Sequence, residues 1–137
     1  MSASLFTLRT FTLALIDDDP IYQLILNRLL KGCQQRCRSQ YFANGPEALA
    51  YLKRNHLDPA STPDAILLDL NLPMLKGWDV LTEIEKIPFS QRPKVYILSS
   101  SIDPEDKHRA QKHPAVSGFL PKPLYLEDLK GLLQKAA

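Results

Sequence analysis

The fold is decided by residues 64–73, Asp64-Ala65-Ile66-Leu67-Leu68-Asp69-Leu70-Asn71-Leu72-Pro73. The run from Ala65 to Leu70 is apolar except for Asp69, which is typical of a strand that is buried on both faces of a sheet. The triplet Asn71-Leu72-Pro73 ends this run. The segment therefore predicts a central strand of an α/β protein, with an acidic side chain near its carboxyl end.

Short β-like runs alternate with amphipathic stretches along the whole chain. The predicted strands are Leu13–Ile16, Gln40–Ala43, Ala65–Leu70, Val95–Leu98 and Val116–Leu120. The predicted helices begin near Ile21, Pro46, Leu75, Pro104 and Leu124. Strands that alternate with helices form mostly parallel sheets with helices on both faces. The sequence therefore predicts an α/β fold with a doubly wound, five-stranded parallel sheet.

The first predicted helix carries apolar residues at helical spacing, and we expect its stripe over Leu24–Leu30 to face the core. Cys33 and Cys37 are expected on consecutive turns near the end of this helix, which is poor geometry for a disulfide. Two cysteines alone also make no zinc site. No special role is therefore expected for either thiol.

Length and composition fit one ordinary domain of 137 residues, with 45% hydrophobic and 23% charged residues. We expect residues 1–12 to form an N-terminal extension and residues 13–137 to form the domain. The net charge of +2 comes from scattered basic residues, which argues against a nucleic-acid partner. No apolar run approaches the roughly 20 residues of a membrane helix. A cytoplasmic protein without a membrane partner is therefore expected.

Polar side chains gather where the predicted strands end. They are Asp17, Asp18 and Asp19 after the first strand, Asp69 and Asn71 at the third, Ser99 at the fourth and Lys122 at the fifth. Ligands of open α/β sheets bind beyond the carboxyl ends of the strands. If the first, third, fourth and fifth strands share one edge, these groups converge there.

The chemistry of such an edge follows from its charges. Crowded carboxylates repel one another, and Mg²⁺ relieves that repulsion because it prefers carboxylates, waters and phosphate oxygens as ligands. The lysine provides a positive charge for a phosphoryl oxygen, and a serine hydroxyl can donate to another. Phosphoryl transfer needs mainly positioning and charge neutralisation, so this combination predicts a phosphoryl-transfer site.

The motifs resemble those of response-regulator receiver domains of the chemotaxis-regulator type, from about Leu13 to Leu133. The segments that carry the resemblance are residues 14–20 (ALIDDDP), 64–73 (DAILLDLNLP), 97–100 (ILSS) and 118–123 (GFLPKP), with Gly77 in the helix after the third strand. The resemblance implies a flavodoxin-like strand order of 2-1-3-4-5. Nothing follows the last predicted helix, so a stand-alone receiver domain without an output domain is expected.

The resemblance also implies roles for single residues. It implies that Asp69 is the phosphoacceptor, that Asp17 and Asp18 hold Mg²⁺ together with Asp69, and that the backbone carbonyl of Asn71 helps. It implies that Lys122 and Ser99 bind the phosphoryl group, with Ser99 as the switch hydroxyl in place of the usual threonine and Phe119 as the rotating aromatic residue. In this family the bond corresponding to Lys122–Pro123 is often cis.

The implied function is a phosphorylation switch and not an enzyme in the ordinary sense. A sensor histidine kinase or a histidine phosphotransfer protein would supply the phosphoryl group. Phosphorylation would change a surface made of the fourth helix, the fifth strand and the fifth helix, which would bind a downstream protein. A monomer or weak homodimer is expected.

Three other interpretations remain to be weighed. A Mg²⁺-dependent phosphatase with an aspartyl nucleophile would carry a second acid where Asn71 stands. A flavin- or nucleotide-binding module would need glycines and free amides after the first strand, where Asp17-Asp18-Asp19-Pro20 would repel phosphate without a metal. A degenerate receiver domain that only binds proteins would not need the complete acidic edge.

Overall fold

The protein is described by a computed structural model that covers residues 10–100 and 103–136. Its strands are β1 (Phe11–Ile16), β2 (Cys37–Phe42), β3 (Ala65–Asp69), β4 (Lys94–Ser99) and β5 (Val116–Pro121). Its helices are α2 (Pro20–Lys31), α3 (Gly45–Asn55), α4 (Gly77–Glu85), α5 (Pro104–Lys112) and α6 (Leu126–Ala136). Strand β1 begins two residues before its predicted start at Leu13, and residues 1–9 of the expected N-terminal extension lie outside the described residues.

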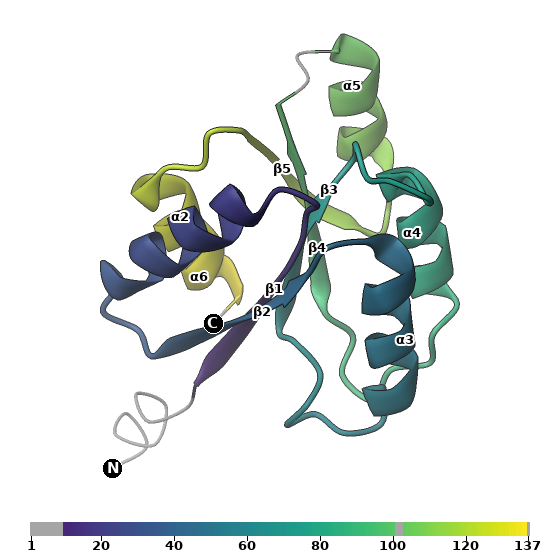
Figure 1. The fold of residues 1–137 in the computed structure, drawn as a ribbon, viewed down its shortest axis with the longest axis horizontal. Helices are drawn as coiled ribbons and strands as arrows, with labels where there is room; N and C mark the ends of the chain where they lie inside the picture. The colour runs from purple at the N-terminus through teal and green to yellow at the C-terminus, as the bar shows by residue number, and fades with distance from the viewer. Residues whose placement is uncertain (1–9, 101–102, 137) are drawn as a thin grey trace.

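The five strands form one parallel sheet in the order β2-β1-β3-β4-β5, which confirms the predicted topology. Helices α2 and α6 cover one face of the sheet, and α3, α4 and α5 lie on the other (Figure 1). The sheet is therefore the middle layer of three.

Two cores, one on each face, explain why β3 is almost uniformly apolar. Ile66 and Leu68 pack into the core on the α3–α4 side, whereas Ala65 and Leu67 pack into the core on the α2–α6 side. Successive side chains of a strand point to opposite faces, so a central strand needs an apolar residue at every position. Burying each large side chain contributes about 1.5–3 kcal/mol.

The amino end of α2 is fixed by the acidic segment that precedes it. Asp19 is the N-cap, and its Oδ1 accepts a hydrogen bond from the Ile21 N–H at 3.0 Å. Pro20 occupies the first helical position, where its missing N–H costs nothing. The third aspartate of the run therefore starts the helix and leaves Asp17 and Asp18 at the end of β1.

One expectation about α2 held in part and one about its continuation was wrong. Leu26 and Leu30 of the expected stripe are buried, whereas Leu24 is 63% exposed. Cys33 follows the end of α2 and Cys37 is the first residue of β2, so the two thiols do not lie on consecutive helical turns. Gly32 ends the helix before either cysteine. Both cysteines are free.

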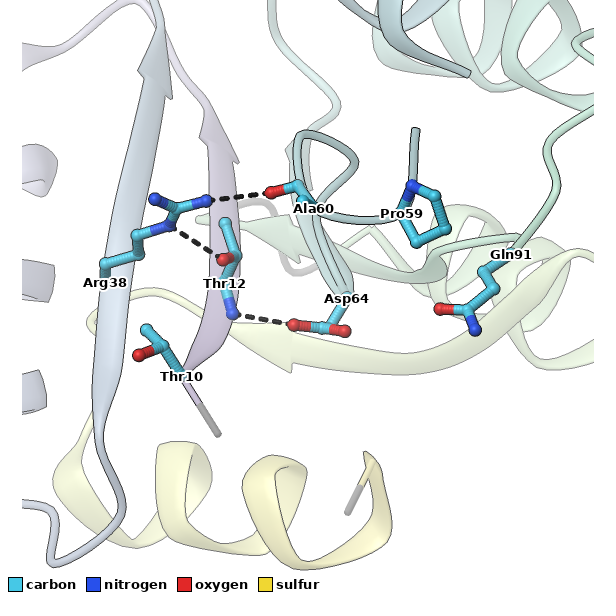
Figure 2. Close-up of a pocket in the computed structure, with 7 residues that line it drawn as sticks. All are labelled: Thr10, Thr12, Arg38, Pro59, Ala60, Asp64 and Gln91. Atoms are coloured by element: carbon cyan, nitrogen blue, oxygen red, sulfur yellow. Dashed lines mark hydrogen bonds between the residues drawn. The ribbon is translucent and has the colours of Figure 1, made fainter. Parts of the chain in front are cut away.

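The amino ends of the strands are braced around a hollow of about 520 Å³ (Figure 2). The Thr12 N–H donates to Asp64 Oδ2 at 2.7 Å, and Arg38 Nε donates to Thr12 Oγ1 at 3.0 Å. Arg38 Nη2 also donates to the Ala60 carbonyl at 3.0 Å. These bonds tie β1, β2 and the loop before β3 together at the edge opposite the strand ends that carry Asp17 and Asp69.

Candidate phosphoacceptor site

The strand register brings the predicted site residues to one edge of the sheet. Ile16 pairs with Leu68, so Asp17 and Asp69 leave neighbouring strands at the same level. Ser99 pairs with Pro121, which places Lys122 just beyond the same edge. The sequence predicted this convergence on the condition that the first, third, fourth and fifth strands share one edge. The fold meets that condition.

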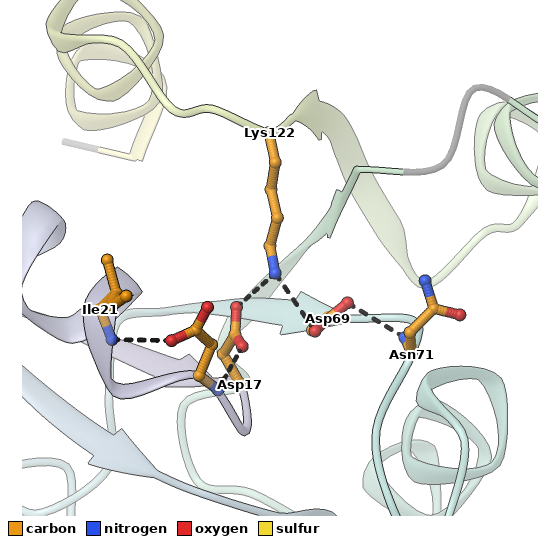
Figure 3. Close-up of polar contacts among 6 residues, drawn as sticks. Asp17, Ile21, Asp69, Asn71 and Lys122 are labelled. Atoms are coloured by element: carbon orange, nitrogen blue, oxygen red, sulfur yellow. Dashed lines mark hydrogen bonds and ion pairs between the residues drawn. The ribbon is translucent and has the colours of Figure 1, made fainter.

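Lys122 lies between two buried carboxylates (Figure 3). Its Nζ is 2.6 Å from Asp17 Oδ2 and 3.2 Å from Asp69 Oδ2. The Asp17 side chain is 0% exposed, that of Asp69 is 5% exposed and that of Lys122 is 8% exposed. One ammonium thus compensates two carboxylates that have little access to water.

Hydrogen bonds from the backbone orient the other carboxylate oxygens. Asp17 Oδ1 accepts from the Asp19 N–H at 2.9 Å, and Asp69 Oδ1 accepts from the Asn71 N–H at 3.0 Å. The Lys122 N–H donates to the Ser99 carbonyl at 2.9 Å, and the Lys122–Pro123 peptide bond is cis. The three hydrogen bonds hold the two carboxylates and the backbone of Lys122 in place.

Three carboxylates offer ligand atoms for a cation. One oxygen from each of Asp17, Asp18 and Asp69 lies within 4.8 Å of the others, and Asp18 is the exposed member. Within the described part of the chain, Asp17 Oδ2 accepts no hydrogen bond of normal geometry, although Lys122 Nζ lies close to it. Carboxylate oxygens are the donors that Mg²⁺ prefers. The residues present therefore fit a hard divalent cation.

The protonation of the pair follows from its burial. Burial raises the pKa of Asp17 above its ordinary value, and the nearby ammonium of Lys122 and the hydrogen bond from the Asp19 N–H only partly oppose this. Burial alone would lower the pKa of Lys122, but the carboxylates of Asp17 and Asp69 raise it above its usual value. The two carboxylates therefore favour the charged form of Lys122, while burial disfavours the charged form of Asp17.

Gly77 permits the close approach of α4 to the end of β3. A Cβ at this position would lie 2.5 Å from the Asp69 carbonyl oxygen and 2.6 Å from Leu70 Cα. The Gly77 N–H donates to the Leu70 carbonyl at 3.0 Å. Both neighbours are backbone atoms, which cannot rotate away as a side chain can. Gly77 therefore sets the position of the backbone that carries Asp69.

Ser99 and Phe119 lie on the strands beyond Asp69. Ser99 ends β4 and is 1% exposed, and Phe119 is partly buried on β5 against the core on the α3–α4 side. Asn71 is exposed directly after β3. The roles predicted for these three residues stay predictions.

One neighbour of the site was missed in the sequence. The ring of Tyr22, in the first turn of α2, has its centroid 4.1 Å from Lys122 Nζ. Neither composition nor spacing marks an aromatic residue here. The sequence did contain one indication. Tyr22 stands in the first turn of a helix that begins directly after the acidic segment, so its side chain has to lie near the strand ends.

A second unpredicted cluster joins α4 to α5 through side chains. Trp78 Nε1 donates to Asp106 Oδ1 at 3.3 Å, and the Arg109 guanidinium lies 4.3 Å from the centre of the Trp78 ring. His113, after α5, stacks near the same ring, and its Nε2 is 3.5 Å from Glu85 Oε1.

Comparisons with known proteins agree on one family. The family model for the response regulator receiver domain matches residues 13–134. The response regulator Rcp1 of Synechocystis is 31% identical over 121 residues, which cover 88% of this chain and 82% of Rcp1. The family model runs from within β1 to within α6 and so includes Asp17, Asp18, Asp69, Ser99 and Lys122.

Solved structures show the same fold. A two-component response regulator from Cytophaga hutchinsonii superposes with a TM-score of 0.82 at 26% identity, covering 93% of this chain and 98% of that one. The receiver domain of the sensor histidine kinase PA1611 from Pseudomonas aeruginosa, described with a magnesium ion in its active-site cleft, has a TM-score of 0.74 at 23% identity and covers 93% and 97%. The chain belongs to the response regulator receiver domain family, whose members act as phosphoacceptor switches in two-component signalling.

Proposed function

We propose that Asp69 accepts a phosphoryl group from the phosphohistidine of a sensor histidine kinase or a histidine phosphotransfer protein. The observation that carries this proposal is the position of Lys122 Nζ between the buried carboxylates of Asp17 and Asp69. A carboxylate that is to be phosphorylated needs a fixed cation for the incoming phosphoryl oxygens.

In the transfer, an oxygen of the Asp69 carboxylate attacks phosphorus. The new O–P bond gives an acyl phosphate, and the N–P bond to the histidine breaks, which returns the electron pair to the imidazole. Lys122 and Ser99 bind phosphoryl oxygens in this proposal. The ammonium neutralises charge, and the hydroxyl donates a hydrogen bond.

Asp17, Asp18 and Asp69 would hold Mg²⁺, with the Asn71 carbonyl as a further ligand. When bound, the ion screens the negative charge that collects between the carboxylates and the phosphoryl oxygens. Asp69 would be both a ligand of the cation and the acceptor of the phosphoryl group. The cation would therefore lie next to the group that becomes phosphorylated.

The test of this function uses acetyl phosphate, a small phosphodonor that needs no partner protein. With Mg²⁺ present, the intact mass of the protein should increase by one phosphoryl group, and chelation of the metal should prevent the increase. Absence of any mass change in the presence of Mg²⁺ would contradict the proposal.

We expect Mg²⁺ to raise the melting temperature of the unphosphorylated protein, because a ligand that binds only the native state stabilises it. Asp18→Ala should remove most of that increase, since it deletes an exposed carboxylate of the cluster without opening the core. Thermal unfolding over a series of Mg²⁺ concentrations measures the effect.

Asp79→Ala is the matched control for that experiment. Asp79 is an exposed acid in the first turn of α4, outside the three-carboxylate cluster. This variant should respond to Mg²⁺ as the parent does. An equal loss of response in the two variants would show that the metal effect comes from general charge and not from a site at Asp18.

The output is proposed to be a change in the surface formed by α5, β5 and α6, which would bind a downstream protein. Of the residues of α5, Ala110 alone is buried, so polar contacts such as those around Trp78 contribute much of its attachment. Contacts of this kind can be exchanged at low cost.

We further propose a monomer or weak homodimer that acts in the cytoplasm without binding nucleic acid. No helix among residues 10–100 and 103–136 is long and apolar enough to cross a membrane.

Trp78 offers a direct readout of that surface, because it is the single tryptophan and contacts α5. Beryllofluoride, a phosphoryl mimic, should change its fluorescence in the parent. Ser99→Ala should still accept phosphate on Asp69 but should show a smaller fluorescence change, because the proposed hydrogen bond from the Ser99 hydroxyl to the phosphoryl group is lost. A full change in Ser99→Ala would contradict a switch role for this hydroxyl.

A further inference from the structure

The ammonium of Lys122 has a third neighbour that carries no charge. Besides the oxygens of Asp17 and Asp69, the face of the Tyr22 ring lies against it, with the ring centroid 4.1 Å from Nζ. A cation within about 6 Å of an aromatic centroid is attracted by the ring quadrupole, and the attraction grows when water is excluded. The Lys122 side chain is only 8% exposed, so this contact lies in a largely dry environment.

Tyr22 is held on a rigid part of the fold. It is the third residue of α2, and its N–H donates to the Asp19 carbonyl at 3.1 Å in the turn that Asp19 caps. Its ring packs against the core on the α2–α6 side and is partly buried. The ring therefore has a place beside Lys122 that is set by α2 and by its packing on the core on the α2–α6 side.

We propose that Tyr22 is a positioning residue for Lys122, an inference that rests on the proposed phosphoacceptor function. Both carboxylates exchange partners during that function, since Asp17 would bind the cation and Asp69 would become an acyl phosphate. The ring has no such competing partner. Tyr22 therefore keeps the ammonium in place while its ionic partners change.

Two substitutions separate the ring from simple packing. Tyr22→Leu keeps an apolar side chain but removes the aromatic face, and Tyr22→Phe keeps the face but removes the hydroxyl. We expect Tyr22→Leu to weaken beryllofluoride binding and to slow phosphorylation by acetyl phosphate, each by about five-fold, as fits a desolvated cation–π contact. Tyr22→Phe should stay within about two-fold of the parent on the same grounds.

A double-mutant cycle with Lys122→Met tests whether Tyr22 acts through the lysine. In the Lys122→Met background, Tyr22→Leu should have no further effect on the rate with acetyl phosphate. A rate loss of the same size in both backgrounds would overturn the inference, because it would show that Tyr22 supports the fold and not the ammonium. Equal losses in Tyr22→Leu and Tyr22→Phe would overturn it as well.

A measurement without phosphate keeps the inference separate from the proposed function. In the NMR spectrum, the ε-methylene protons of Lys122 should be shifted upfield by the ring, and Tyr22→Leu should abolish this shift while Tyr22→Phe retains it. An unshifted signal in the parent would overturn the contact. If the parent bound no beryllofluoride, the proposed function would fail, and the NMR result alone would decide whether Tyr22 holds the ammonium.

Discussion

Asp69→Asn should abolish phosphoryl incorporation from acetyl phosphate while leaving the fold intact. The amide is nearly the same size as the carboxylate, and its oxygen can still accept the Asn71 N–H that Asp69 Oδ1 accepts at 3.0 Å. It has no anionic oxygen to attack phosphorus. Intact-mass spectrometry after incubation with acetyl phosphate and Mg²⁺ measures the loss.

Asp18→Asn is the matched control, because it removes one charge from the same carboxylate cluster and leaves the proposed acceptor in place. Its labelling should be slower than that of the parent but should still reach one phosphoryl group per chain. Parent-like labelling of Asp69→Asn would mean that another residue is the acceptor.

Lys122→Met should produce the largest loss of stability among the changes at this site. Methionine preserves an unbranched side chain of similar length but leaves the carboxylates of Asp17 and Asp69 buried without their cation. Removing one partner of a buried ion pair costs about 3 kcal/mol or more. Chemical denaturation in the absence of Mg²⁺ measures the free energy of unfolding.

The pH dependence of this loss has a definite sign. Burial already raises the pKa of Asp17, and the close ammonium of Lys122 acts to lower it. Without Lys122, this pKa should rise further. Between the pKa of Asp17 in the unfolded chain and its raised pKa in the native variant, the native state therefore binds a proton that the unfolded chain has released. The stability deficit of Lys122→Met should therefore grow as the pH rises through the raised pKa and shrink as the pH falls.

Mg²⁺ should restore part of the stability of Lys122→Met, because it replaces one missing positive charge near the same oxygens. Lys107→Met is the control, since Lys107 is exposed on α5 and its loss should change stability by less than about 0.5 kcal/mol. A Lys122→Met variant as stable as Lys107→Met at neutral pH would show that the buried carboxylates do not need the ammonium.

We also expect Lys122→Met to impair phosphorylation and the Trp78 response more than Ser99→Ala does.

The features that the sequence predicts well are those set by local pattern and strand direction. The apolar run of β3 requires burial on both faces, and parallel strands place their carboxyl ends at one edge, so the convergence of Asp17, Asp69 and Lys122 followed from the alternation of elements. The helix start at Asp103-Pro104 was also predictable, because capping is a local interaction.

The features that could not be predicted depend on distances between elements. Leu24 and Leu26 are equally apolar, and only the way α2 lies on the sheet decides that Leu24 is exposed and Leu26 is buried. The contact between Tyr22 and Lys122 joins residues 100 positions apart in the chain and leaves no periodic signal. The attachment of α5 through Trp78 is likewise a tertiary contact between side chains that look unremarkable in the sequence.

The most direct test of the central claim locates the phosphoryl group chemically. Borohydride reduces an aspartyl phosphate to homoserine, so the protein phosphorylated with acetyl phosphate and Mg²⁺ can be reduced, digested and sequenced by mass spectrometry. The structure predicts homoserine at position 69 alone, and only when Mg²⁺ was present. Homoserine at Asp17 or Asp18, or at position 69 to the same extent without the metal, would contradict a Mg²⁺-dependent phosphoacceptor site built on Asp69.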